Sequence, residues 1–313
     1  VIFGIAAFVL FLIPATRRNW ITLNIGCVLA FGSVATANET YKIGVLAKRG
    51  PVKALSQWKA TGDYLTAHVA DKTFEIVPLD FDEVNPAIEA NRVDFFLVNS
   101  SMFVTAKVRF GAEAVATMIN SRQGQPLKSF GGVVITTEDN DAINELGDLK
   151  GKTFMAVKKS SFGGWQMAYK EFMDAGIDPY RDFAKIEFGG KHDNVVLAVQ
   201  GGVVDAGTVR TDTLERMAAE GTIEMDEFKI IGSKAHEGFP FVSSTALYPE
   251  WPLARTAKTS ATVAQEVVKA LSQMTPQDPA AKDAKVVGWT AALDYGPVQA
   301  LQETLKVGAY ASK

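Results

Sequence analysis

The sequence predicts an α/β fold with largely parallel sheets. From residue 41 onward, strand-like segments alternate with segments whose apolar residues recur at helical spacing. This alternation is typical of parallel sheets covered by helices. Two predicted strands, DFFLV at 94–98 and TFMAV at 153–157, are continuously apolar, as expected of strands buried on both faces. Because no Pro- or Ser-rich linker interrupts the chain, we expect two lobes joined by strands rather than two independent domains.

The predicted elements follow one another in a regular order. The expected strands are 41–47, 74–79, 94–98, 114–119, 132–137, 153–157, 185–188, 203–209, 228–231 and 241–247. The expected helices cover 55–69, a segment that Asp82 caps with Pro86 in its first turn, 102–110, 165–175, 195–200 and 211–219. Two further helices are expected from the shared apolar faces of 263–274 and 298–305.

The bulk composition is that of a soluble globular protein. The 313 residues suffice for one large domain or two ordinary lobes. Hydrophobic residues make up 47% of the chain and charged residues 21%. The formal net charge of −3 argues against nucleic acid as the main partner.

The N-terminal segment has the pattern of a secretory signal. Arg17 and Arg18 precede an apolar stretch at 21–34, and the following Ala-Thr-Ala resembles a cleavage site. We expect cleavage after Ala37 and export to the periplasm. The alternative is a membrane anchor, but the stretch is shorter than the ~20 apolar residues of a spanning helix. The apolar segment 1–15 has no assigned role.

Cys27 is the only cysteine of the chain and lies inside this predicted signal. A lipoprotein would carry its lipid on Cys27, but Asn24 stands where that motif requires Leu. Removal of the signal would leave 38–313 without cysteine, which excludes disulfides and thiolate chemistry there.

Polar residues gather in the turns that follow the predicted strands. These turns hold Lys48-Arg49-Gly50, Asn99-Ser100-Ser101, KKSSFGG at 158–164, GGKHDN at 189–194 and Arg210-Thr211-Asp212. Ligands of open α/β sheets bind beyond the carboxyl ends of the strands. Free N–H groups at helix starts, serine hydroxyls and cationic side chains all favour an anion there. The alternative is that these residues only cap helices and form tight turns, but the same chemistry in five turns favours an anion site.

Three residues near these turns have two possible roles each. His192 precedes a predicted helix and is either a surface residue or a donor to an oxyanion. Asp205 lies inside a strand pattern, and since a buried carboxylate needs a partner, it either locks a turn or contacts the ligand. Trp165 follows the glycines of the 158–164 turn and either walls the ligand cleft or packs in the core.

No catalytic or metal-binding motif is recognisable. The segment GDLKGKT at 147–153 has one residue too few between its glycines for a P-loop, and it precedes a strand. Lys159 occupies the first glycine position of a nucleophile elbow around Ser161. The three histidines are widely spaced and have no cysteine beside them. We therefore expect no metal, no cofactor and no enzyme activity.

Five segments carry a resemblance to a known family: 44–65, VDFFLVNSSMF at 93–103, 131–157, KSSFGGWQM at 159–167, and 189–217. They resemble the periplasmic phosphate-, phosphite- and phosphonate-binding proteins. They are even more similar to the related sensor domains fused to, or working beside, bacterial histidine kinases, including tetrathionate-type sensors. The resemblance covers roughly 41–308 and implies a two-lobed, type II periplasmic-binding-protein fold (Venus flytrap). Each lobe would have a mostly parallel sheet, with lobe 1 at 38–131 plus 240–313, lobe 2 at 132–239, and two hinge crossovers.

The resemblance also implies which residues bind the ligand. The family's anion loop falls on 160–164, its loop histidine on His192, its Val-Asp strand on Val204-Asp205, and the carboxylate that holds the amine of aminophosphonates on Asp212. The sequence departs from the phosphonate binders, because Gly163 replaces one anion-loop serine and an aromatic near the end of DFFLV is absent. The predicted ligand-binding residues are Arg49, Asn99, Ser100, Ser101, Ser160, Ser161, Gly163, Gly164, Trp165, His192, Asp205, Arg210, Thr211 and Asp212, together with Lys48.

These observations predict a periplasmic solute-binding protein that captures a small oxyanion in a cleft between its lobes for an ABC transporter. The ligand would be phosphonate-, phosphite- or phosphate-like, or a sulfur oxyanion. The alternative is a stand-alone sensory module that signals to a two-component histidine kinase. The expected partners are therefore the oxyanion and either an ABC permease or a membrane histidine kinase. We expect no fused kinase after Val307, and an enzyme of the thiamine-pyrimidine type is a third hypothesis without a visible nucleophile.

Overall fold

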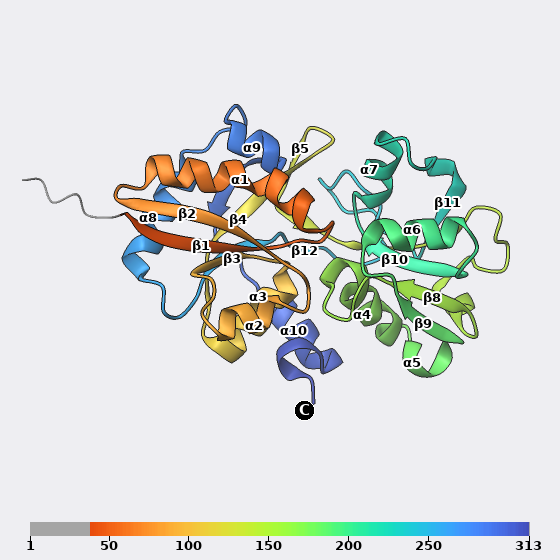
Figure 1. The fold of residues 1–313 in the computed structure, drawn as a ribbon. Helices are drawn as coiled ribbons and strands as arrows, with labels where there is room; N and C mark the ends of the chain where they lie inside the picture. The colour runs from red at the N-terminus through yellow and green to blue at the C-terminus, as the bar shows by residue number, and fades with distance from the viewer. Residues whose placement is uncertain (1–37, 313) are drawn as a thin grey trace, which may run out of the picture. The chain divides into compact units, whose positions relative to one another are not determined.

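The computed structural model describes residues 38–312 of the chain. The signal predicted at 1–37, with Cys27, lies outside the described residues. Two separate β-sheets organise the described part, and Figure 1 shows helices packed against each of them. Within 38–312, no helix combines the length and the apolar character that crossing a membrane requires.

The first sheet has seven strands in the order β14-β4-β13-β3-β1-β2, with β5 paired to β4. They are β1 (Glu39–Leu46), β2 (Lys72–Leu79), β3 (Phe95–Leu97), β4 (Glu113–Arg122), β5 (Gln125–Leu127), β13 (Pro252–Arg255) and β14 (Val286–Ala291). β1 pairs in parallel with β2 and β3, whereas the pairs that involve β4 or β13 are antiparallel.

The second sheet has five strands in the order β11-β7-β10-β8-β9. They are β7 (Gly132–Thr137), β8 (Thr153–Ala156), β9 (Lys185–Phe188), β10 (Ala206–Arg210) and β11 (Phe228–Ile231). β8 pairs in parallel with β9 and β10, whereas β7 pairs antiparallel with β10 and β11. The fold therefore has the two sheets expected of a two-lobed binding protein.

Both sheets are mixed, and the expectation of mostly parallel pairing is wrong. A parallel neighbour requires a crossover connection, usually a helix, between two strands. β7 and β13 instead carry the chain directly from the other sheet, with no helix in front of them. Each consequently enters its sheet antiparallel to its neighbours.

Helices cover the two sheets. They are α1 (Pro51–His68), α2 (Val84–Glu89), α3 (Ser100–Phe110), α4 (Met167–Asp174), α5 (Pro179–Asp182), α6 (His192–Gln200), α7 (Thr213–Ala219), α8 (Ala261–Ser272), α9 (Pro279–Ala284) and α10 (Gly296–Leu305). α1 begins at Pro51, whose missing N–H has no intrahelical partner to lose at that position. It buries Trp58 and Leu65 and packs along β2.

Two short segments carry the chain between the sheets and pair with each other. β6 (Ser129–Phe130) runs antiparallel to β12 (Tyr248–Pro249). The strand expected at 241–247 is wrong, because that stretch is irregular apart from one bridge between Lys234 and Ser243.

Side chains replace the missing backbone ladder in this stretch. Ser244 Oγ accepts a hydrogen bond from the Val134 N–H at 2.8 Å and donates one to the Ile231 carbonyl at 2.7 Å. Ser244 is fully buried. Its hydroxyl therefore holds the stretch 241–247 against the second sheet.

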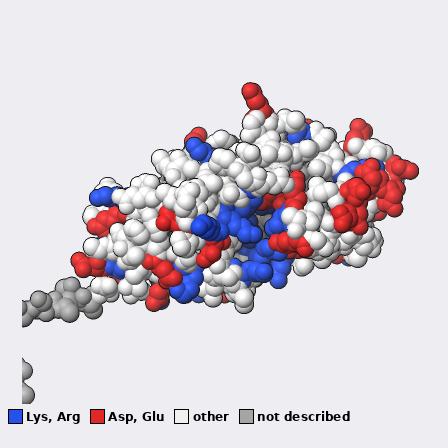
Figure 2. Space-filling view, turned by 90° about the horizontal axis from the view of Figure 1, so that it is seen from above, with Lys and Arg blue, Asp and Glu red and all other residues white. Residues whose placement is uncertain are grey.

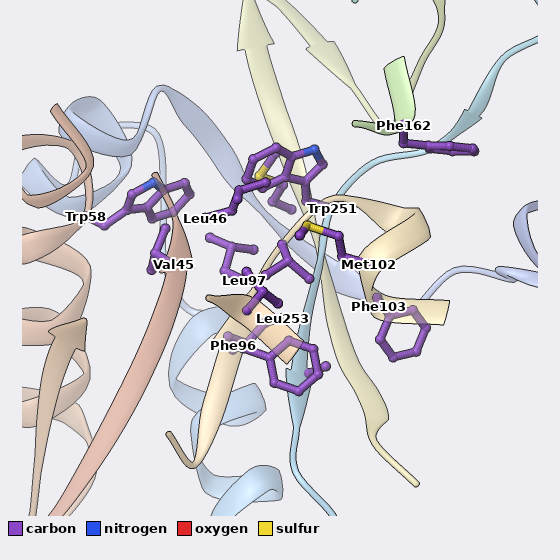
Figure 3. Close-up of a cluster of buried hydrophobic side chains, with 14 of the residues drawn as sticks. Val45, Leu46, Trp58, Phe96, Leu97, Met102, Phe103, Phe162, Trp251 and Leu253 are labelled. Atoms are coloured by element: carbon purple, nitrogen blue, oxygen red, sulfur yellow. The ribbon is translucent and has the colours of Figure 1, made fainter. Parts of the chain in front are cut away.

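One hydrophobic cluster extends from the first sheet to the turn after β8. Figure 3 shows Leu46, Leu97 and Trp251 gathered in this cluster, with Phe162 at its edge. The ring of Phe162 lies 5.0 Å from the ring of Tyr248 in β12, centroid to centroid. The turn after β8 is therefore packed directly on the segment that links the two sheets.

We expect Ser244→Ala to lower the free energy of unfolding by about 1–3 kcal/mol, because it leaves the buried Val134 N–H without an acceptor. Urea denaturation followed by circular dichroism measures the change. Ser272→Ala, at an exposed helix position, is the matched control and should stay within about 0.5 kcal/mol of the wild type. Equal stability of the two variants would contradict the role given to Ser244.

Candidate functional site

A cavity of about 650 Å³ lies where the carboxyl ends of β1, β4 and β10 meet the starts of α1, α6 and α7. Its charged lining residues are Lys48, Arg49, Lys53, Arg122, Arg210, Arg216, Lys282, Lys285, Asp193, Asp212, Glu215, Glu220 and Asp283. Figure 2 shows Lys and Arg side chains gathered around a hollow in the face seen there. Eight cationic residues against five carboxylates give this lining an excess of positive charge, which favours an anion.

Arg210 is the last residue of β10 and is 4% exposed. Its Nη2 donates to Glu250 Oε1 at 2.9 Å, and its Nε donates to Asp212 Oδ1 at 3.0 Å. The guanidinium also lies 4.3 Å from the centre of the Phe130 ring. The remaining nitrogen, Nη1, is buried and has no hydrogen-bond partner within the described part of the chain. Since a buried N–H without a partner is costly, Nη1 is a place for an oxygen of a ligand.

Asp212 has both carboxylate oxygens engaged by arginines. Oδ1 pairs with Arg210 and Oδ2 with Arg122. Burial raises the pKa of Asp212, but Arg210 and then Arg122 and Lys48 outweigh burial and hold this pKa below its usual value. The resemblance implied that Asp212 would hold a ligand amine. Its contacts do not support that role, because two cations already neutralise the carboxylate.

Lys48 follows β1 and lines the cavity beside Arg210. Its ammonium lies 5.0 Å from the centre of the Trp251 ring, and none of the carboxylates between residues 38 and 312 is within ion-pair distance of it. Burial, followed by the charges of Arg210 and Arg122, lowers the pKa of Lys48 to about 7. An anion placed beside Lys48 would stabilise its charged form.

His192 is the first residue of α6 and is neutral in this environment. Its Nδ1 accepts a hydrogen bond from the Arg210 backbone N–H at 3.3 Å. This bond requires an unprotonated Nδ1, so Nε2 carries the hydrogen and is a donor. Burial, followed by the charges of Lys48 and Arg210, lowers the pKa of His192 to about 3. His192 can therefore donate one hydrogen bond without adding charge.

The turn at 158–164 approaches these groups through a second cavity of only about 10 Å³. Asn99, Ser161 and Gly163 line it together with Lys48, His192 and Arg210, and the last three line both cavities. A π-helical turn, Phe162–Gln166, opens the helix that continues as α4. Within 38–312, the N–H groups of Phe162 and Gly163 donate to no acceptor outside this turn. These free donors at a helix start add to the anion-binding character of the site.

Close packing requires the two glycines of this turn. A Cβ on Gly163 would lie 2.8 Å from the Cβ of Arg210, and one on Gly164 would lie 2.4 Å from Cγ2 of Val157. A serine at position 163, which the resemblance implies for the phosphonate binders, would displace Arg210. Gly163 therefore lets the turn pack closely against the Cβ of Arg210.

The residues predicted after β3 have structural partners. Asn99 caps α3 by accepting from the Met102 N–H, and its Nδ2 donates to the Ser160 carbonyl at 3.3 Å. Ser100 Oγ donates to the Pro249 carbonyl and Ser101 Oγ to Gln166 Oε1, both at 2.5 Å. Neither serine lines the two cavities. They join α3 to β12 and to the turn that precedes α4.

Thr211 also has a structural partner, since its Oγ1 accepts a hydrogen bond from the Gly131 N–H at 3.2 Å. Ser160 contributes its carbonyl to Asn99. Neither residue is among those that line the two cavities.

Asp205 and Trp165 lie away from the cavities. Asp205 precedes β10, at the opposite end of that strand from Arg210, and its Oδ2 accepts from Thr153 N at 2.7 Å and Thr153 Oγ1 at 2.6 Å. Trp165 is 1% exposed and packs against Phe154 in the core of the second sheet. Asp205 therefore binds Thr153, and Trp165 packs in the core. Neither residue lines the two cavities, so their predicted contact with a ligand is not supported.

Arg49 lines the cavity as part of a ring of four charges. It pairs with Asp193 at 3.1 Å and Glu220 at 3.0 Å, and Arg216 pairs with the same two carboxylates. Arg49 follows β1 of the first sheet, whereas the other three residues lie in or directly after α6 and α7. The ring therefore connects the two halves of the fold across the cavity.

Arg122 and Glu250 belong to the site but are not among the residues predicted from the sequence. Arg122 is the last residue of β4, and the strand predicted at 114–119 ended too early to place it at a carboxyl end. Glu250 is completely buried and accepts from Arg210 and, at 2.5 Å, from Asn120 Nδ2. Of the two, only Arg122 could have been predicted from the sequence, because a strand extended to residue 122 would have placed it at a carboxyl end. No group of three His, Cys, Asp or Glu within 38–312 is arranged to hold a metal.

We expect Asp205→Asn to lower the free energy of unfolding at pH 7 by about 1–2 kcal/mol, since Thr153 loses a charged acceptor. The hydrogen bonds from Thr153 hold the pKa of Asp205 below its usual value. The stabilising effect is therefore present above the ordinary Asp pKa and is lost as the pH falls through the lowered pKa. Denaturation at pH 7 and in acid should show a difference between variant and wild type that shrinks in acid. Asp226→Asn, at an exposed position, is the control.

Comparison with known proteins confirms the resemblance found in the sequence. Residues 43–295 match the family described as ABC transporter, phosphonate, periplasmic substrate-binding protein. The tetrathionate sensor histidine kinase TtrS of Salmonella typhimurium is 32% identical over 232 residues, which are 74% of this chain and 39% of the kinase. The chain thus spans well under half the length of this curated relative.

Solved structures share the fold at low sequence identity. XAC2383 from Xanthomonas citri bound to ATP has a TM-score of 0.70 at 18% identity, covering 88% of this chain and 100% of that chain. A binding-protein component of an ABC phosphonate transporter from Pseudomonas aeruginosa has a TM-score of 0.70 at 18% identity, covering 85% and 86%. PhnD1 from Prochlorococcus marinus in complex with methylphosphonate has a TM-score of 0.68 at 15% identity, covering 86% and 99%.

The family match extends over most of the chain and over both sheets, from β1 to the residue before α10. The chain belongs to the family of periplasmic substrate-binding proteins of phosphonate ABC transporters.

Proposed function

We propose that this protein binds a small oxyanion in the cavity beside Lys48 and Arg210 and presents it to an ABC permease. The observation that carries the proposal is the set of unused donors around the two cavities. Arg210 Nη1 and the Lys48 ammonium have no acceptor within 38–312, and the N–H groups of Phe162 and Gly163, which line the smaller cavity, have none outside their own turn. These donors come from both sheets, so a bound oxyanion would join them.

The proposal includes a hinge. Residues 38–131 with 240–313 would form one lobe and 132–239 the other, and β6 with β12 would form the crossovers between them. Closure of such lobes over a ligand is a motion between two discrete states. The signal expected at the N-terminus would export the protein to the periplasm, and its role there would be binding rather than catalysis.

We expect at least one anion of a panel to raise the melting temperature of the protein. The panel comprises phosphate, phosphite, methylphosphonate, sulfate, thiosulfate, tetrathionate and arsenite. A ligand at 100 times its Kd stabilises by about 2.7 kcal/mol, which corresponds to several degrees for a protein of this size. Absence of any shift across the panel would refute the proposal.

Lys48→Met should weaken binding of the active anion about tenfold or more, since a charged donor is lost. It should also raise the melting temperature of the ligand-free protein at pH 6. Burial disfavours the charged ammonium in the folded state, so its removal relieves a cost that is fully present below pH 7. Lys258→Met, at an exposed position outside the cavity, is the matched control.

The affinity for a fully ionised anion, such as sulfate or a sulfonate, should fall as the pH rises through about 7. The anion prefers charged Lys48, whose pKa is about 7 before binding, so binding takes up a proton in this range. His192, with a pKa of about 3, stays neutral and does not contribute. Titration calorimetry of Lys48→Arg, which keeps its charge, should show a flat profile above pH 7. The same slope in this variant would assign the pH dependence to another group.

A sensory role is the second candidate. The observation in its favour is the 32% identity with a tetrathionate sensor histidine kinase. The protein would then bind its anion and dock on a kinase instead of a permease. Neighbouring genes for a permease and an ATPase support transport, whereas genes for a kinase and a response regulator support sensing.

A further inference from the structure

In the larger cavity, the lining arginines form ion pairs with carboxylates of the described chain, whereas the lining lysines do not. Each of the four lining arginines has a carboxylate partner: Arg49 and Arg216 share Asp193 and Glu220, Arg122 pairs with Asp212, and Arg210 pairs with Asp212 and Glu250. These four arginines are matched by four carboxylates. Their charges therefore cancel within the protein.

The four lining lysines have no such partner in the described chain. Lys48, Lys53, Lys282 and Lys285 form no ion pair, and the lining carboxyls left unpaired are Glu215 and Asp283. With Lys48 charged, as a neighbouring anion would keep it, four unpaired lysines against two unpaired carboxyls leave an excess of two positive charges facing the cavity. An occupant that neutralises this excess carries two negative charges.

Three of these lysines lie apart from the inner site. Lys53 belongs to α1, Lys282 to α9, and Lys285 follows α9 directly. α1 and α9 pack side by side, as Figure 1 shows, and Gln57 of α1 donates to the Ala284 carbonyl at 2.9 Å. The three lysines are exposed, and none of them lines the smaller cavity at the 158–164 turn. They form an outer cationic wall, distinct from Lys48 and Arg210.

The volume of the cavity also favours a ligand larger than a single oxyanion. A tetrahedral oxyanion of five heavy atoms displaces only about two or three water molecules of ~30 Å³ each. It would fill roughly a tenth of the 650 Å³ available. Cavities of this size usually hold ligands larger than a single oxyanion. An anion seated against Arg210 would leave the outer wall and most of the space to water.

We propose that the ligand is an elongated dianion with two separate oxyanion groups, one at Lys48 and Arg210 and the other at the outer wall of Lys53, Lys282 and Lys285. This inference rests on the proposed function, because it adds a second subsite to the same cavity. The inner subsite supplies directed donors from the buried Arg210 and the half-buried Lys48, and the outer wall supplies charge on exposed lysine side chains. The outer wall therefore tolerates ligands of different lengths more readily than ligands of different net charge.

Titration calorimetry with α,ω-alkanedisulfonates tests this proposal. Methanesulfonate is compared with ethane-, propane- and butanedisulfonate, and methylphosphonate is compared with the corresponding diphosphonates. We expect at least one dianion to bind about tenfold or more tightly than its one-headed counterpart. In the variant Lys53→Gln, Lys282→Gln, Lys285→Gln this advantage should vanish, while affinity for the one-headed anion stays within about twofold.

A matched variant separates a subsite from general charge. Lys150→Gln, Lys258→Gln, Lys269→Gln removes the same three charges from exposed positions outside the cavity and should keep the preference for the dianion. Equal binding of one-headed and two-headed anions by the wild type would overturn the second subsite and leave the proposed function standing. Equal loss in both triple variants would also overturn it. Failure of every anion to bind would refute the proposed function itself.

Discussion

The site depends on the burial of one guanidinium. Moving a charge out of water is so costly that it persists in an interior only when partners surround it. Arg210 meets this condition with Glu250 and Asp212, and Phe130 covers its face. Glu250 in turn accepts from Asn120, and Asp212 pairs with Arg122. The strand β10 is thereby tied to β4 and to Glu250, which lies between β12 and β13; β4 and β13 belong to the other sheet.

This network explains why the site is made of residues far apart in the chain. Among residues 38–312, Nη1 of Arg210 has no acceptor, and it lies beside Lys48, whose pKa is lowered by burial. An anion bound between these two groups would accept from the free nitrogen and stabilise the charged lysine. Gly163 is part of the same arrangement, because only a residue without a Cβ lets the 158–164 turn pack against Arg210.

The limits of sequence-based prediction here follow from the range of the interactions. The strand-to-helix turns could be predicted, because apolar runs and the polar residues that end them are local. The roles of Arg122 and Glu250 could not, because the Arg210–Glu250 contact joins residues 40 positions apart and no local pattern encodes it. Trp165 and Asp205 show a second limit. Spacing places both near the turns, but it does not tell which face or which end of the strand each occupies.

The ring of Arg49, Asp193, Arg216 and Glu220 bears on how long a ligand stays bound. Single ion pairs of this exposure contribute at most about 1 kcal/mol, but here the departure of Arg49 breaks contacts to two carboxylates at once. Since the ring spans the cavity, a ligand would have to open it both to enter and to leave, so the ring would slow exchange in both directions. Added salt screens such pairs. The residence time of the ligand should therefore shorten with ionic strength, independently of the weaker attraction between the anion and its site.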